Sequence, residues 1–303
     1  MTTRNENTAV HTARDAVRTV RGSETSDGAG VRLRRYIASP ELDMLDPFLL
    51  LDVFRSDDPD DYIAGFPPHP HRGFETVTYL LHGNMRHRDS AGHEGVIRSG
   101  GVQWMTAGSG IEHSEMPEQV QGLLAGFQLW VNLPASDKMR APRYQEFEPD
   151  EVPIETRGSG ARVHVVAGET IEGTTGVVSN IAAAPLYLDV ELPVGADFSE
   201  RVPAGHNAFV YVIEGDIELI GDNKRMLSPA QSLLVLGDGD GVEIRAATAA
   251  RFLLVAGKPF NEPVARYGPF VMNTQEEIQR AFADYRAGKF GHVNDGGGSD
   301  ATR

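Results

Sequence analysis

Cysteine is absent from this 303-residue chain. Without thiols, neither a disulfide framework nor a thiolate zinc site can form, so any metal must be held by nitrogen and oxygen ligands. Long hydrophobic runs are also missing: "FLLLDVF" (48–54) is broken by Asp52, and the amino terminus has no apolar core of signal-peptide length. We therefore expect a cytoplasmic protein with no membrane partner.

Positive charge is scarce as well. The chain has 28 Lys and Arg against 43 Asp and Glu, a formal net charge of −15, and a pI of about 5.1. Such a field repels a polyphosphate, and the basic stretch "RLRRY" (32–36) is too small to reverse it. The sequence therefore argues against direct nucleic-acid binding.

Turn-forming residues, in contrast, are abundant, with 33 glycines and 18 prolines. They separate short apolar stretches, such as "FETVTYLL" and "AFVYVIEG", that often alternate and are rich in β-branched residues, which favours a sandwich or barrel over βαβ units. One helix is predicted within residues 273–288, where Thr274 and Glu277 form a capping box and Gly288 is a stop signal. An all-β fold with a short carboxy-terminal helix is expected.

The length favours two domains. A boundary is indicated within residues 143–156, which are acidic and contain two prolines. "TVTYLLHGN" (76–84) resembles "AFVYVIEGD" (208–216), and "MTAGSGIEH" (105–113) resembles "LGDGDGVEI" (236–244), at nearly the same offset. Repeats of this kind predict duplicated barrels. We expect domains at residues 1–145 and 146–303, the second including the helix and a flexible tail (294–303).

Two histidine-rich segments point to a metal site. "HPHRGFE" (69–75) places His69 and His71 two apart, and "GIEHSE" (110–115) does the same for His113 and Glu115. On strands, each pair shares one face, and Pro70 keeps its segment extended. If both faces line one barrel, three imidazoles and a carboxylate converge. Such a set suits iron(II), nickel, cobalt, copper or manganese, and leaves positions of an octahedral ion open for substrate or dioxygen.

Other interpretations of these residues stay open. A histidine pair arises by chance, although six of the ten histidines lie between residues 69 and 113. His82, His87 and His93 are expected to be mostly exposed near hairpin turns, with His82 the nearest to the pocket. Glu75 is a rival ligand by its parity, but a bulge at Gly73 would turn it away, leaving it as an acceptor for an imidazole N–H.

At these residues the sequence resembles the pirin family of the cupin superfamily. The resemblance covers nearly the whole chain and is carried by "FPPHPHRGFETVTYLLHG", "GVQWMTAGSGIEHSEMP" and "GPFVMNTQEEI". It implies two tandem cupin (jelly-roll) barrels, with the carboxy-terminal segment reaching back to the first. It also implies one divalent metal, with Fe(II) expected, bound in the first barrel by His69, His71, His113 and Glu115 and not by Glu75.

The duplication gives a check on the second barrel. Transferring the four ligand positions at the repeat offsets, without gaps, places Arg201, Pro203, Ile244 and Ala246 opposite them. These residues cannot form a comparable site, so the second barrel is expected to bind no metal.

Some pirins are similar in activity to quercetin 2,3-dioxygenases, which open a flavonol ring with dioxygen. The resemblance therefore implies a small-molecule substrate and O2, with Glu115 as the catalytic residue that takes the proton of the substrate hydroxyl. An alternative is a non-enzymatic, metal-dependent regulator that binds a transcription factor or metabolic enzyme, and another is an idle structural barrel. Candidate pocket walls are Phe66, Phe74, Leu81, Trp104, Met105 and Met116. Each is also compatible with ordinary core packing, which is the favoured interpretation for Trp104 and Met105.

Overall fold

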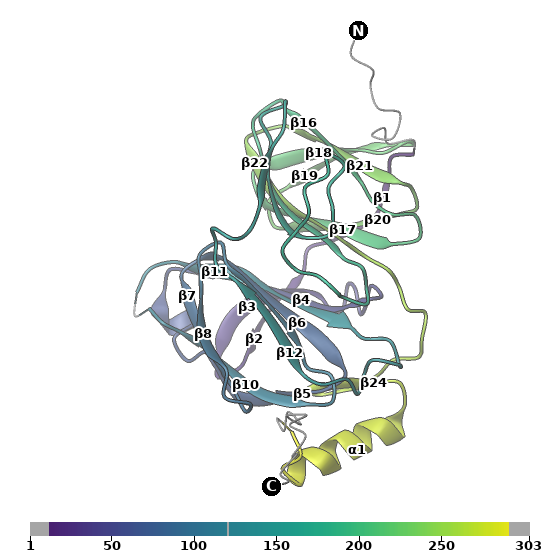
Figure 1. The fold of residues 1–303 in the computed structure, drawn as a ribbon. Helices are drawn as coiled ribbons and strands as arrows, with labels where there is room; N and C mark the ends of the chain where they lie inside the picture. Colours follow the sequence, from purple (N-terminus) through teal and green to yellow (C-terminus); the bar gives the residue numbers. More distant parts are fainter. Residues whose placement is uncertain (1–11, 120, 291–303) are drawn as a thin grey trace, which may run out of the picture.

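The protein was analysed as a computed structural model that describes residues 12–119 and 121–290. The flexible tail expected at residues 294–303 lies outside this range. Two β-barrels are stacked on each other, and a single α-helix lies under the first barrel (Figure 1). Each barrel consists of a seven-stranded sheet and a four-stranded sheet. The prediction of an all-β fold of two tandem barrels with a carboxy-terminal helix is confirmed.

The first barrel is built from eleven of the strands. Its larger sheet has the order β12 (Arg143–Phe147), β9 (Val102–Thr106), β6 (Phe74–His82), β11 (Leu124–Asn132), β4 (Phe48–Ser56), β3 (Val31–Ile37) and β2 (Ser23–Asp27). Its smaller sheet has the order β5 (Phe66–His71), β10 (Ile111–Pro117), β7 (Asn84–Asp89) and β8 (Glu94–Arg98).

The second barrel repeats this arrangement strand for strand. Its larger sheet has the order β1 (Ala16–Val20), β20 (Ser232–Leu236), β17 (Asn207–Glu214), β22 (Ala250–Gly257), β15 (Leu186–Leu192), β14 (Arg162–Ala167) and β13 (Ile154–Thr156). Its smaller sheet has the order β16 (Asp197–Arg201), β21 (Gly241–Ala246), β18 (Asp216–Ile220) and β19 (Arg225–Pro229). The similar segments 76–84 and 208–216 lie mostly in β6 and β17, which occupy equivalent positions. The second pair, 105–113 and 236–244, joins β9 to β10 and β20 to β21, which are equivalent as well.

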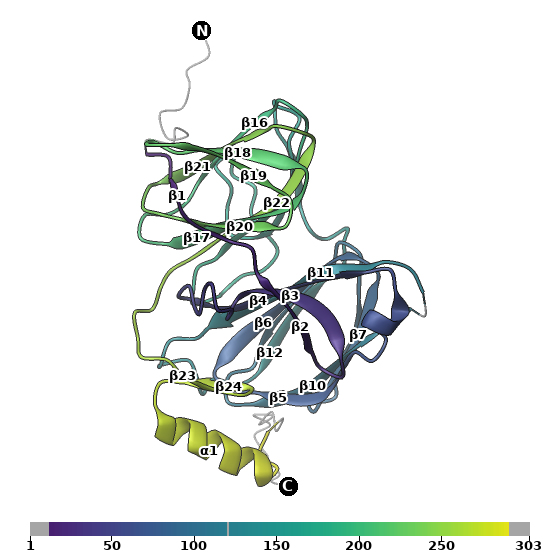
Figure 2. The ribbon, with the colours of Figure 1, turned by 180° about the vertical axis from the view of Figure 1, so that it is seen from behind.

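One outer strand of the second barrel comes from the start of the chain. β1 pairs with β20, at the position that β12 takes beside β9 in the first barrel (Figure 2). The start of the described chain therefore adds a strand to the second barrel, whereas its end returns to the first. The division into domains at residues 145 and 146 stays a prediction.

Aromatic side chains join the two barrels. The larger sheets face each other across an apolar core, where Phe48 packs edge-on against Phe209 with ring centroids 5.3 Å apart. The Tyr36 ring meets the Tyr211 ring in the same way at 4.9 Å. Edge-to-face aromatic pairs add to the stabilisation that comes from area burial alone. The barrels are thus held by a shared hydrophobic core.

The two barrel interiors differ in chemistry. The second is filled by apolar side chains, including Phe198, Ile244 and Ala246. The register pairs Ile244 with Phe198, so the ungapped transfer that placed Arg201 opposite His69 is wrong. β16 is shifted along β21 relative to that transfer, so that Phe198, and not Arg201, lies opposite Ile244. An apolar side chain therefore occupies the position that a histidine occupies in the first barrel.

The carboxy-terminal segment returns to the first barrel, as the resemblance implied. β23 (Ala265–Tyr267) and β24 (Phe270–Met272) form a hairpin, followed by α1 (Gln275–Arg286). The predicted capping box between Thr274 and Glu277 is present. Arg72 of the first barrel ties this segment down by an ion pair with Asp284 at 2.9 Å. Figure 1 shows α1 beside β5 and β24.

The first barrel also contains a short 3-10 turn, η2 (Pro59–Asp61). In the part of the chain that the structure describes, no helix has the length and apolar character that a membrane crossing requires. The cytoplasmic location stays a prediction of the sequence.

Gly73 and Gly92 give a matched pair of substitutions that tests how tightly the carboxy-terminal hairpin packs. Both have a positive φ, 87° and 92°, so alanine at either costs about 1–2 kcal/mol. A methyl group at Gly73 would also collide with the carbonyl oxygen of Val271, whereas the space at Gly92 is open. We expect Gly73→Ala to lower the free energy of unfolding by roughly 1–3 kcal/mol more than Gly92→Ala, measured by urea denaturation. Equal losses would contradict this packing.

Candidate metal centre

Strand pairing places the predicted histidines together. β5 pairs with β10 so that His69 lies directly opposite His113, and His71 lies opposite Ile111. Three prolines within or next to β5 suit an outer strand, because proline cannot donate a ladder hydrogen bond. The sequence pattern thus fixes both the extended backbone and the register on which the site depends.

The three imidazoles form a compact cluster. Their potential ligand atoms all lie within 4.8 Å of one another. The ring centroid of His69 lies 4.4 Å from that of His113 and 4.7 Å from that of His71. Among the described residues, this is the only such group of three or more metal-ligating side chains.

The hydrogen bonds of these rings suit metal binding. Nδ1 of His69 lies 2.8 Å from the carbonyl oxygen of Pro67, and Nδ1 of His71 lies 3.4 Å from that of Pro269. A carbonyl only accepts, so Nδ1 is the donor in each ring and Nε2 keeps its lone pair. Both ring nitrogens of His113 are buried without a hydrogen-bond partner. An ion at this cluster would satisfy the nitrogen that carries the lone pair.

Burial favours the neutral form of two of the three rings, His71 and His113. Burial, and then the neighbouring His69, lowers the pKa of His71 well below its usual range. Burial, and then His71 and His69, does the same to the pKa of His113. A neutral imidazole is the form that coordinates a metal. The donor set therefore suits a divalent ion.

Glu115 is placed differently from the histidines. It is buried and lines a cavity together with His69 and His71. Its Oε1 accepts a hydrogen bond from Thr78 Oγ1 at 2.7 Å, and Gln128 Nε2 lies 3.4 Å from its Oε2. Thr78 and Gln128 were not anticipated from the sequence. The alternation of side chains along β6 and β11, which turns both residues inward, is the sequence pattern that could have identified them. The role of Glu115 as the fourth ligand stays a prediction.

Glu75 does not accept a hydrogen bond from an imidazole, so that expectation is wrong. Its carboxylate accepts hydrogen bonds from Trp104 Nε1 at 3.0 Å and Thr106 Oγ1 at 2.7 Å. Gly73, with a φ of 87°, separates β5 from β6 and resets the alternation of faces. Burial raises the pKa of Glu75. It holds the neighbouring strand β9 in place.

His69 and His71 open into a cavity of about 710 Å³. Of the expected wall residues, Phe66 lines it, whereas the lining does not include Phe74, Leu81, Trp104, Met105 or Met116. The expectation is wrong for Phe74, Leu81 and Met116, which face the cores or other surfaces. Trp104 and Met105 are packed in buried apolar clusters, as favoured for these two. Phe74 still packs on the His71 ring, with centroids 5.1 Å apart. The principal aromatic wall is Trp130, whose ring centroid lies 5.2 Å from that of His71.

The expected exposure of the other histidines is only partly right. His82 is exposed and does not line the cavity. His87 is buried, with 2% of its surface accessible, because it lies opposite Glu115 in the pairing of β7 with β10. Its Nε2 lies 2.6 Å from Oε2 of Glu146. His93 remains largely exposed beside Asp89.

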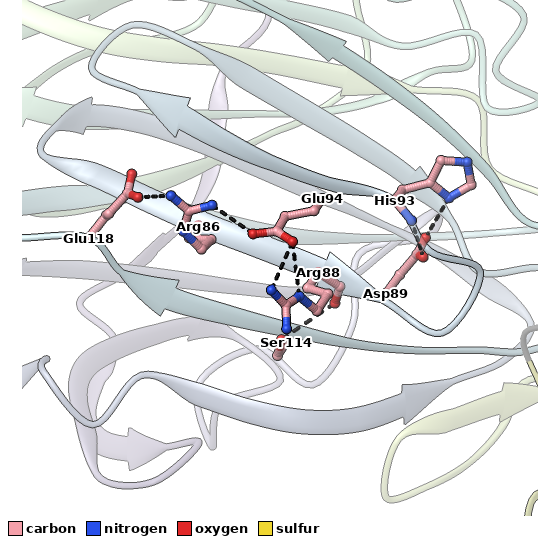
Figure 3. A network of polar contacts seen from close by, with 7 residues as sticks. All are labelled: Arg86, Arg88, Asp89, His93, Glu94, Ser114 and Glu118. Atoms are coloured by element: carbon pink, nitrogen blue, oxygen red, sulfur yellow. Dashed lines mark hydrogen bonds and ion pairs between the residues drawn. The ribbon is translucent and has the colours of Figure 1, made fainter.

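The outward face of the same sheet carries charged side chains that pair with one another (Figure 3). Arg88 Nη2 donates to Glu94 at 2.8 Å, and Ser114 Oγ donates to the carbonyl oxygen of Arg88 at 3.4 Å. Ser114 lies between His113 and Glu115 in the sequence. Because side chains alternate along a strand, the outward position of Ser114 means that His113 and Glu115 point into the barrel.

Comparison with known proteins supports the same assignment. The Pirin family model matches residues 30–131, and the Pirin C-terminal cupin domain model matches residues 187–291. The chain belongs to the pirin family. A pirin-like protein from Caulobacter vibrioides is 53% identical over 277 residues, which cover 91% of this chain and 99% of the relative. Pirin from Homo sapiens is 46% identical over 276 residues, covering 88% and 91%.

A crystal structure extends the comparison to the fold. Quercetin 2,3-dioxygenase from Acinetobacter baumannii superposes with a TM-score of 0.83 at 34% sequence identity. The match covers 93% of this chain and 99% of that protein. Both barrels of this pirin therefore have a counterpart in a single solved protein.

Removing one imidazole should abolish metal binding at this centre. We expect His113→Ala to lower the affinity for a divalent metal at least about 100-fold, because a two-histidine remnant lacks a complete donor set. The measurement is metal content after dialysis against a weak chelator. His164→Ala, which alters a half-buried histidine of the second barrel, is the control. Loss of metal in both variants, or in neither, would refute the assignment.

The metal-free protein should lose stability on mild acidification. Burial holds the folded-state pKa of His71 and His113 below the ordinary value of 6.5, so below about pH 6.5 the unfolded chain binds more protons. The stability is complete above that pH and falls as the pH drops. Urea midpoints measured across this window should decrease less steeply for His113→Phe. An identical pH dependence in both proteins would contradict the burial effect.

Proposed function

We propose that the protein is a metal-dependent dioxygenase that opens the ring of a flavonol or a similar enolic substrate with O2. The observation that carries the proposal is a cluster of three imidazoles, two of which line a cavity large enough for such a molecule. The 34% identical quercetin 2,3-dioxygenase from Acinetobacter baumannii supports this reaction class.

The metal would be held by His69, His71 and His113, with Glu115 as a fourth ligand. Fe(II) is the ion we expect, and nickel, cobalt, copper or manganese would also suit a set of three nitrogens and one oxygen. Bound there, the ion supplies Lewis acidity toward the substrate hydroxyl and a site for dioxygen. The remaining requirements are met by side chains of the chain itself.

Glu115 is suited to take and hold the substrate proton. Thr78 Oγ1 lies 2.7 Å from Glu115 Oε1 and 2.6 Å from Gln128 Oε1, yet a hydroxyl has a single proton to donate. If Glu115 Oε1 carries a proton, it donates to Thr78, which donates to Gln128 Oε1. Gln128 Nε2 then faces Glu115 Oε2 at 3.4 Å. The three side chains form a closed ring that stabilises the protonated carboxyl.

The test is oxygen uptake by the iron-loaded protein with quercetin. We expect turnover in the wild type and a 10²–10⁴-fold loss of kcat in Glu115→Gln, the typical size of an acid–base contribution. Glu191→Gln, at an exposed ion pair of the second barrel, is the control and should match the wild type.

Absence of turnover above the metal-free background would refute the proposal. Recovery of one stoichiometric protein partner from the same preparation would then favour the alternative, a non-enzymatic regulator that binds a transcription factor or a metabolic enzyme.

A further inference from the structure

Arg266 is a charged residue that the carboxy-terminal hairpin delivers to the metal cavity. It lies on β23, far in sequence from the first barrel, and lines the same cavity as His69 and His71. Its Nη1 donates to the carbonyl oxygen of Leu49 at 3.0 Å, which anchors the side chain across the first barrel. A cation thus forms part of the wall.

The guanidinium of Arg266 has no acidic partner. Among the described residues, no carboxylate lies within ion-pair distance of it, and its other contact is with the Trp130 ring, 4.9 Å below its central carbon. Burial, and then the nearby Arg35, lowers the pKa of Arg266. A partly desolvated guanidinium of this kind gains when an anion binds to it.

The acidic residues in the same wall, Asp27 and Asp52, form ion pairs with a different arginine. Arg35 donates to both oxygens of Asp52, at 2.8 Å and 2.7 Å, and to Asp27 at 2.7 Å. These carboxylates therefore have less capacity to pair with Arg266. The N–H groups of the Arg266 guanidinium that do not contact Leu49 are therefore available to bind a ligand.

Trp130 connects this cation to the metal centre. Its ring touches the guanidinium on one side, and its centroid lies 5.2 Å from the ring centroid of His71. The cavity lining thus includes two imidazoles, a guanidinium, and an indole that contacts both kinds of group. Since Arg266 and Phe74 pack on the indole ring, a flat aromatic or enolic molecule that reaches both the imidazoles and the guanidinium would pass along the indole edge.

We propose that Arg266 determines substrate specificity by binding a carboxylate, so that the preferred substrate has a metal-binding hydroxyl at one end and a carboxylate at the other. This inference deepens the proposed function. It rests on that function in one respect, the placement of the substrate hydroxyl at the histidines. A neutral flavonol would leave the guanidinium unpaired and would therefore be a poorer ligand than an aromatic acid of matching length.

The test compares catechol with protocatechuate, which differs from it only by a carboxylate. Both are titrated by calorimetry into zinc-loaded protein, where no turnover occurs. We expect the wild type to bind protocatechuate about tenfold more tightly than catechol, since a charge-assisted pair contributes this much. Arg266→Gln should remove this preference and leave the catechol affinity unchanged. Arg245→Gln, at an exposed ion pair of the second barrel, controls for the change in net charge.

Two further measurements allow for a folding defect in Arg266→Gln. Arg266→Lys keeps the charge but loses the planar fork, so it should retain a preference of only a few-fold. In the wild type, added salt should weaken protocatechuate binding more than catechol binding. A wild type without preference, or a full preference in Arg266→Gln, would overturn the proposal. Failure of quercetin turnover would not, because these titrations measure binding alone.

Discussion

The pairing of β5 with β10 is the constraint on which the site depends. It sets His69 opposite His113 inside a barrel and brings His71 into the same cluster. A shift of one residue would turn these side chains to the other face of the sheet. The two buried nitrogens of His113 have no protein partner, and leaving such groups unsatisfied costs about 1–3 kcal/mol each. The fold therefore holds a destabilising arrangement that a bound ion would relieve in part, since one ion binds one nitrogen of the ring.

The second barrel shows what the same topology does without that constraint. Its strands follow the same order, but Phe198 and Ile244 face each other in an apolar core. Such a core contributes to stability through burial. The first barrel has an apolar cluster that includes Leu33, Phe54 and Met85, residues that also line the metal cavity. The duplication thus separates a barrel with an apolar interior from one that holds a histidine cluster beside a cavity.

The sequence predicted the parts of the site that local patterns encode. Pro70 and the spacing of His69 and His71 predicted an extended strand with a shared face, and the structure has both. The capping box at Thr274 was equally local. His87 was expected to be exposed because turns flank it, but its side chain follows the inward parity of β7. Arg266 could not be predicted, because its partner Leu49 is 217 residues away in the chain.

The central claim is that the three imidazoles hold the catalytic metal, with Glu115 completing the set. A crystal structure of the metal-loaded protein, with the ion located by its anomalous scattering, tests it most directly. The account predicts one ion in the first barrel, bound by His69, His71 and His113, with a Glu115 oxygen at about 2.0–2.2 Å. An ion at any other place, or a first barrel without one at full metal loading, would contradict it.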